Sequence, residues 1–548
     1  MKKKILAAII AAIILLIVPF GNNASGAIIL QRAYFTGNNI FNYFMNNGVF
    51  NQNNTNGSTA GLYWAADSMK SYCFTAGFNI SGIVNGQLAQ FMASYSGEYA
   101  PGYYENGVYE TNVDMKIYMV KRTDNSLTNP DYANWYKMIR FGAPYEDLNN
   151  NCMYDDGIDK PGVPAASQTL FIAFADGDIS QRSPGNGFGG GITNPIFGAE
   201  AKLTVWAYDV YLPDVQYMRY QIINKSENIW DSTYFGIFAD PDSPLPADLL
   251  KDLPGCDTLL DLGYNWNNDT AFVCGSYGVQ VLQGPYNEVT GDTLEMTAFT
   301  FIRFNHPCQW EVTGMPRGAH NYLKGYKTDG TPFLDPTYTP YKKTKFAFSG
   351  DPETNAGWTP SKGFILNCNG ADTGAFVVIQ GYDGKFAVST GADNLKIMPG
   401  DTQNVYFAQM LAKGVTNKNS VTKLKSLAHS SRVFFKSGLT EDIERNCSVT
   451  PVPEDFGIMQ NFPNPFNGST VIRYSLPRSA YVKITVYDML GKDIAVLVNG
   501  QISPGYYETN ISAKNLSSGI YFYRMEVIDN TINNAHKLGR VYKMAVIK

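Results

Sequence analysis

The sequence is poor in histidine and in the short motifs that mark many metal, redox and hydrolytic sites. Four histidines occur in 548 residues, and none forms a His-Glu-x-x-His pair. Cys-x-x-Cys, Gly-x-Ser-x-Gly and a glycine loop ending in Gly-Lys-Ser/Thr are also absent. Zinc peptidases, thiolate zinc or redox sites, α/β-hydrolases and P-loop enzymes therefore lose their usual sequence support. A net charge of −5 provides no basic field, so no nucleic-acid partner is expected.

Long apolar runs are absent beyond the first residues. Lys2, Lys3 and Lys4 precede a short apolar run at 5–18, and small residues follow at 24–27. Such a run is too short to span a bilayer comfortably and leads into a cleavage region. We expect residues 1–27 to be a secretory signal peptide, with an uncleaved anchor as the alternative. The mature protein is expected to be soluble or held at a surface by other means.

Aromatic and turn-forming residues are abundant. Tyr, Phe and Trp make up 14% of the chain against 17% charged residues, which favours strands joined by polar turns over helix bundles. Short apolar runs bounded by Gly, Asn and Pro predict antiparallel sheets packed face to face. The strand-like runs lie at 115–120, 203–208, 217–223, 234–238, 375–380 and 403–411.

Helical signals are few. Residues 38–47 predict a short helix. A second helix is expected to begin near Ser420, because Val421, Leu424 and Ala428 share one stripe at helical spacing.

The predicted fold class is mainly β, with β-sandwich-like body domains followed by a small Ig-like C-terminal β-sandwich. In the terminal region, Val482, Ile484 and Val486 alternate with polar residues and fall on one strand face. The length of this region suits a small sandwich. The predicted parts after the signal peptide are an N-terminal β-rich region at 28–200, a second β-rich region at 201–435, a linker at 436–452 and a terminal domain at 453–548.

The terminal region carries a series of motifs in a fixed order. They are 461–467 (NFPNPFN), 470–477 (TVIRYSLP), 486–491 (VYDMLG), Gly505, 516–523 (LSSGIYFY), and the closing Lys543, Met544 and Lys548. Together they resemble the type A C-terminal sorting domain of type IX secretion. The alternative is an ordinary Ig-like adhesion domain, which needs the alternation but not these turn sequences. The motif residues are Asn461, Pro463, Asn464, Pro465, Tyr487, Asp488, Gly491, Gly519, Tyr521 and Lys543.

This resemblance implies an export route. The family passes the inner membrane by its signal peptide, and an outer-membrane translocon and its sorting machinery then recognise the folded terminal domain. The domain is usually removed as the cargo is released or joined to surface lipopolysaccharide. The expected location is therefore extracellular or at the outer-membrane surface, after passage through the periplasm.

The body also resembles large secreted bacterial proteins of unassigned function that accompany this sorting domain. The resemblance implies no catalytic residues. The residues that carry it lie at 97–102, 185–191, 240–242, 256–258, 262–264 and 282–285.

The best candidate site in the body is an Asn- and Asp-rich loop at 147–159. Oxygen-bearing side chains at alternate positions resemble the opening of a calcium loop, because a hard cation needs several oxygens that converge from a tight turn. Cys152 stands where an EF-hand needs glycine and Ile158 where it needs glutamate, so the loop would be a looser structural Ca²⁺ site. The alternative is a solvated turn that caps its own backbone. The predicted ligands are Asp147, Asn149, Asn151, the carbonyl of Met153, Asp155, and Asp156 or Asp159.

A second acidic stretch contains Asp240, Asp242, Asp248 and Asp252. Closeness in sequence is weak support for convergence in space, so a solvated loop is favoured over a second cation site.

Seven cysteines leave at least one unpaired. Their spacing does not select a pairing, and small buried side chains with one or two bridges are expected.

Two functions fit these patterns. The favoured one is a non-catalytic binding or structural protein, with a glycan as a candidate ligand of its aromatic side chains. The alternative is a secreted glycan- or peptide-active hydrolase, which would need an open cleft with two facing carboxylates.

Overall fold

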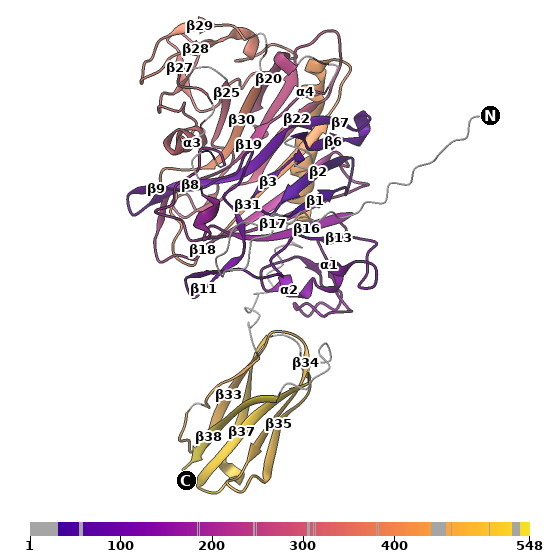
Figure 1. The fold of residues 1–548 in the computed structure, drawn as a ribbon, viewed down its shortest axis with the longest axis vertical. Coiled ribbons are helices and arrows are strands. Elements are labelled where there is room, and N and C mark those ends of the chain that lie inside the picture. The colour runs from indigo at the N-terminus through magenta and orange to yellow at the C-terminus, as the bar shows by residue number, and fades with distance from the viewer. Residues whose placement is uncertain are drawn as a thin grey trace, which may run out of the picture. The chain divides into compact units, whose positions relative to one another are not determined.

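We describe the fold from a computed structural model (Figure 1). The described residues fall into two compact units, one within 1–122 and 165–437 and the other within 123–164 and 438–548. The signal peptide expected at 1–27 and residues 440–452 of the expected linker lie outside the described residues. The described residues are 31–53, 59–182, 185, 187–244, 247, 249–303, 307–310, 312, 314–379, 381, 383–439, 456–461, 463–502, 505–528 and 537–547.

The first unit contains a sheet of ten described strands in the order β25-β30-β19-β8-β3-β2-β6-β7, with β1 beside β2 and β9 beside β8. All neighbours in it are antiparallel. The strands are β1 (Arg32–Phe35), β2 (Ile40–Met45), β3 (Val49–Phe50), β6 (Leu62–Trp64), β7 (Lys70–Cys73), β8 (Thr75–Val84), β9 (Gln87–Phe91), β19 (Trp230–Asp240), β25 (Ala298–Arg303) and β30 (Gly384–Gly391).

A second antiparallel sheet of nine described strands has the order β10-β16-β17-β18-β31-β22-β21-β20, with β13 beside β16. The strands are β10 (Ala100–Pro101), β13 (Tyr118–Lys121), β16 (Gln168–Ala175), β17 (Ala199–Ala207), β18 (Val215–Asn224), β20 (Asp252–Asp257), β21 (Leu262–Asn267), β22 (Ser276–Gln283) and β31 (Thr402–Ala412).

The two sheets pack face to face and share one core. The ring of Phe78 on β8 stacks on Tyr220 of β18 with centroids 3.8 Å apart. Asn51 Nδ2, beside β3, donates to Gln409 Oε1 of β31 at 2.8 Å. A side chain at Gly263 of β21 would collide with Val388 of β30, so glycine lets the sheets approach closely. The prediction of a mainly β, sandwich-like body is confirmed.

A helix covers the second sheet. Helix α4 (Asn417–Phe434) packs on β31, β21 and β22, and buries Val421, Leu424 and Ala428 as expected. The Thr416 side chain accepts from the Asn419 N–H at 3.1 Å and caps its N-terminus. In the described residues no helix combines the length and apolarity needed to cross a membrane.

The other predicted helix, at 38–47, is wrong. These residues form β2, in which Ile40, Asn42 and Phe44 are buried and Phe41 and Tyr43 are partly exposed. This alternation has a period of two, so the aromatic residues pack as a strand.

Each sheet contains strands from both sides of residue 200, so most of the two predicted body regions forms one compact unit, and residues 123–164 are grouped with the other. For example, β8 pairs with β19 and β18 with β31. Alternation in the sequence indicates strands but not their distant partners.

Smaller elements border the sheets. The helices are η1 (Ala65–Asp67), η2 (Ile179–Gln181), η3 (Leu249–Lys251), α3 (Pro316–Leu323), η4 (Pro360–Lys362) and η5 (Phe435–Leu439). The short hairpins pair β4 (Gln52–Asn53) with β5 (Thr59–Ala60), β11 (Tyr103–Glu105) with β12 (Val108–Glu110), β23 (Tyr286–Asn287) with β24 (Asp292–Thr293), β26 (Phe333–Asp335) with β27 (Lys342–Thr344), and β28 (Phe364–Leu366) with β29 (Ala375–Val377).

Cys308 and Cys368 form a disulfide, and Cys152 is also disulfide-bonded. Cys73, Cys256 and Cys274 are free and buried.

The second unit includes residues 123–164, with α1 (Pro130–Ala133), α2 (Tyr136–Ile139) and the pair β14 (Tyr145–Glu146) and β15 (Lys160–Pro161). Its terminal residues form a three-stranded and a four-stranded antiparallel sheet, which enclose one core that includes Val482, Ile484 and Val486. The elements are β32 (Gly457–Ile458), β33 (Ser469–Leu476) and β36 (Gly505–Ser512) in one sheet, β34 (Ala480–Tyr487), β35 (Asp493–Ile502), β37 (Gly519–Ile528) and β38 (Lys537–Val546) in the other, and η6 (Ala513–Asn515).

Candidate functional site

The first motif of the terminal region, at 461–467, fastens the entering chain to the sandwich. The Asn461 side chain is 1% exposed, and its Nδ2 donates to the Pro463 carbonyl at 3.1 Å and to Thr470 Oγ1 at 3.0 Å. The Asn461 N–H donates to the Tyr523 hydroxyl at 2.7 Å, which donates onward to the Met459 carbonyl at 2.6 Å. This buried asparagine therefore joins the motif to β33 and β37.

Asn464 attaches the same segment to the last strand. Its Nδ2 donates to the Lys543 carbonyl at 3.0 Å, and its Oδ1 accepts from the Ala545 N–H at 2.8 Å. Two residues on, the Phe466 N–H donates to the Ala545 carbonyl at 3.0 Å. Residues 463–466 thus lie beside β38 and close that edge of the sandwich.

The turn between β34 and β35 follows Tyr487. Asp488 Oδ1 accepts from the Leu490 N–H at 2.8 Å and from the Lys492 N–H at 2.9 Å. Gly491 has φ +81°, a conformation that favours glycine. In this turn the side chains of Met489 and Leu490 are 70% and 94% exposed.

The remaining motif positions lie at the pairing of β37 with β38. Gly519 pairs with Val546, and Lys543 pairs with Phe522. The Tyr521 hydroxyl accepts from the Ser517 N–H at 3.1 Å and donates to the Ser517 carbonyl at 3.2 Å. The structure therefore brings the motif residues into caps, turns and strand pairs that build the sandwich.

The sequence of residues 460–538 matches the family described as the secretion system C-terminal sorting domain. The chain is a type IX secretion cargo with a type A C-terminal sorting domain. It is therefore exported to the cell surface or the extracellular space, and its sorting domain interacts with the type IX machinery.

No curated protein matches the cargo chain. Among solved structures, it is similar to a polysaccharide lyase at 7% identity and a TM-score of 0.18, with 64% of this chain and 34% of that chain covered. It is also similar to a chain described as an aldose 1-epimerase from Klebsiella pneumoniae subsp. pneumoniae, at 9% identity and a TM-score of 0.17, with 73% and 86% covered. The cargo thus spans about a third of the length of the lyase. At these TM-scores neither similarity indicates an activity.

The loop at 147–159 gathers the predicted oxygen-bearing side chains around Asp155. Asp155 Oδ2 accepts from Asn149 Nδ2 at 2.7 Å and from Asn151 Nδ2 at 2.6 Å. Asp147 Oδ2 accepts from the Cys152 N–H at 2.8 Å, and Asp159 Oδ2 accepts from the Asp155 N–H at 2.7 Å. These are the contacts of a self-capped Asx turn.

Two further observations concern the same loop. The Met153 N–H donates to Asn151 Oδ1 at 2.8 Å. Burial raises the pKa of Asp159, although the N–H groups of Asp155 and Leu148 oppose the rise, and the charges of Asp147 and Asp155 add to it. The calcium site stays a prediction.

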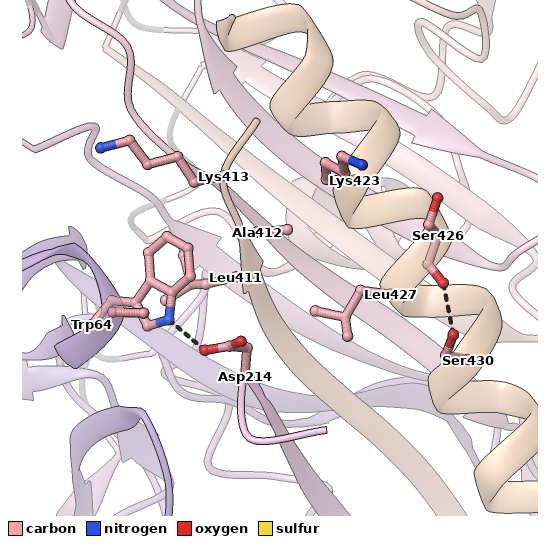
Figure 2. Close-up of a pocket in the computed structure, with 10 residues that line it drawn as sticks. Trp64, Asp214, Leu411, Ala412, Lys413, Lys423, Ser426, Leu427 and Ser430 are labelled. Carbon is pink, nitrogen blue, oxygen red and sulfur yellow. Dashed lines mark hydrogen bonds between the residues drawn. The ribbon is translucent and has the colours of Figure 1, made fainter. Parts of the chain in front are cut away.

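A pocket of about 520 Å³ opens beside α4 in the first unit (Figure 2). Its one acidic lining residue, Asp214, accepts through Oδ1 from Trp64 Nε1 at 2.7 Å and from Asn39 Nδ2 at 2.9 Å. Lys413, which also lines the pocket, donates to Asp67 Oδ1 at 2.7 Å. The lining of this pocket therefore lacks the two facing carboxylates of a hydrolase. The lining residues are Trp64, Ala66, Asp214, Leu411, Ala412, Lys413, Lys423, Ser426, Leu427 and Ser430.

Proposed function

We propose that the body of this cargo acts outside the cell as a non-catalytic binding or structural protein, and that the sorting domain directs it across the outer membrane. The match of residues 460–538 to a secretion sorting domain supports the role of the terminal domain in export. The terminal domain has a hydrophobic core of its own, so the translocon can recognise it as a folded unit. We assign the module an Ig-like architecture on its two antiparallel sheets.

The pocket beside α4 supports the binding role of the body. Its lining combines the polar side chains of Lys423, Ser426 and Ser430 with the apolar side chain of Leu427. Such a mixture can receive the hydroxyl groups and C–H faces of a sugar. We propose a glycan as its ligand, and surface lipopolysaccharide as the attachment point of a cargo that stays on the cell.

We also propose that the loop at 147–159 binds a structural Ca²⁺ ion. Asn149, Asn151 and Asp159 all contact Asp155, and Asp147 caps the same turn, so a small rearrangement could direct their oxygens, which hard cations select, toward one ion.

Deletion of residues 453–548 tests whether the terminal domain directs the cargo across the outer membrane. We expect the truncated cargo to accumulate in the periplasm, since the translocon has lost what it recognises. The periplasmic product must resist protease as the full chain does, which separates a sorting defect from misfolding. Equal amounts of truncated and full-length cargo in the medium would refute this role of the terminal domain.

A further inference from the structure

The second acidic stretch meets a distant carboxylate. Asp240 is the last residue of β19, Asp242 follows it, and Asp383 directly precedes β30. Strands β19 and β30 are antiparallel neighbours, with Ala239 opposite Phe386, so the end of one strand lies beside the start of the other. One oxygen from each of the three carboxylates lies within 4.8 Å of the other two.

The other members of the predicted acidic stretch do not join this cluster. Asp252 Oδ1 accepts from Asn267 Nδ2 at 2.8 Å, and Asp252 also binds the Ser243 hydroxyl. Asp248 lies outside the described residues. The expectation of a solvated loop is wrong at Asp240, which is 6% exposed.

The two carboxylate oxygens of Asp240 differ in their hydrogen bonding. Its Oδ2 accepts from the Tyr95 hydroxyl at 2.6 Å. Its Oδ1 is buried and has no hydrogen-bond partner among the described residues. A buried carboxylate oxygen without a donor costs free energy that a bound cation would recover.

The charges around the cluster favour a divalent ion. Burial raises the pKa of Asp240 to about 8 and that of Asp242 to about 6, and the charge of Asp383 adds to both rises. The Lys385 ammonium opposes them and lies 5.4 Å from the centroid of the Tyr95 ring. A cation that binds would displace the protons that these carboxyl groups retain, and the three carboxylates with the Lys385 ammonium then sum to two negative charges, which one divalent cation neutralises.

We propose that Asp240, Asp242 and Asp383 bind a hard divalent cation of the calcium class. Calcium takes oxygen ligands at about 2.3–2.6 Å, so two ligands on opposite sides of the ion lie up to about 5 Å apart. The carboxylate oxygens, which all lie within 4.8 Å of one another, are therefore close enough to bind one ion. Asp383 is exposed, so the ion can enter from solvent and complete its coordination with water.

Terbium luminescence on the full-length cargo tests this site. Tb³⁺ replaces Ca²⁺ at oxygen sites, and Tyr95 is close enough to the carboxylates to sensitise its emission. We expect a tyrosine-sensitised signal that CaCl₂ displaces, an at least tenfold weaker affinity in Asp383→Asn because the site loses a charged ligand, and a reduced signal in Tyr95→Phe. Asp292→Asn, an exposed isosteric change on β24, should bind as wild type does.

The loop at 147–159 requires its own control, since it could also bind the probe. Asp147→Ala should leave the Tyr95-dependent part of the emission unchanged. The proposal is overturned if Asp383→Asn binds Tb³⁺ and Ca²⁺ as tightly as wild type, or if calorimetry with CaCl₂ detects no binding that depends on Asp242 or Asp383. Because Asp383 is exposed, its asparagine variant should keep the fold, which circular dichroism checks.

Discussion

Replacing Asn461 with alanine should loosen the sorting domain without changing the body. The side chain is buried, and the change removes its donors to Pro463 and Thr470. Each buried group left without a partner costs about 1–3 kcal/mol. The Pro463 carbonyl keeps the Thr470 hydroxyl as a donor at 2.7 Å, so the cost should lie at the low end, about 2 kcal/mol in total.

Hydrogen exchange measured by mass spectrometry on the full-length cargo can isolate this effect. A loss of 2 kcal/mol corresponds to about 30-fold faster exchange of amides that open only when the module unfolds. Peptides from β33 and β37 should show this acceleration, and peptides from the body should not. Asn510→Ala on β36, where the side chain is exposed, is the matched control and should exchange as wild type does. If Asn461→Ala and Asn510→Ala exchange alike, the role assigned to Asn461 is wrong.

Three further predictions concern the body. Burial, with the charges of Lys324 and Arg317, lowers the pKa of His320 to about 4, so the unfolded state binds a proton between about pH 4 and 6.5 that the native state does not. The unfolding free energy should therefore fall as the pH drops through this range, and His320→Gln should flatten the fall measured by urea titration; an unchanged slope would contradict this. Phe78→Ala should cost about 3–5 kcal/mol in the same titration, because a buried ring of the sheet interface is lost; a cost under 1 kcal/mol would argue against the shared core. Calcium should raise the melting temperature of wild type more than that of Asp147→Ala, and an equal rise would remove the loop site.

Local periodicity made much of the fold predictable. The alternation at Val482, Ile484 and Val486 identified β34, and the stripe at Val421, Leu424 and Ala428 identified α4, since both patterns report burial on one face. The segment at 38–47 was misassigned because aromatic residues pack in strands and helices alike. Its period of two, visible at Ile40, Asn42 and Phe44, was the available signal.

Long-range pairing was not predictable from one sequence. Asp383 meets Asp240 only because β30 lies beside β19, and no local pattern selects that neighbour. The sequence did not show that the two predicted body regions share both sheets, because these sheets pair strands that are distant in the chain. In contrast, the turn motif at Asp488 and Gly491 involves contacts between residues close in sequence. The contacts of Asn461 and Asn464 with β37 and β38 are distant in the chain and were not predictable.

The most direct test of the central claim is transfer of the sorting domain to another protein. Residues 453–548 would be fused to a folded periplasmic reporter with its own signal peptide, and the fraction of reporter outside the cell would be measured. The account predicts export of the fusion and retention of the reporter alone. A fusion that stays in the periplasm with its sorting domain intact and folded would contradict the claim that this domain is sufficient as an address.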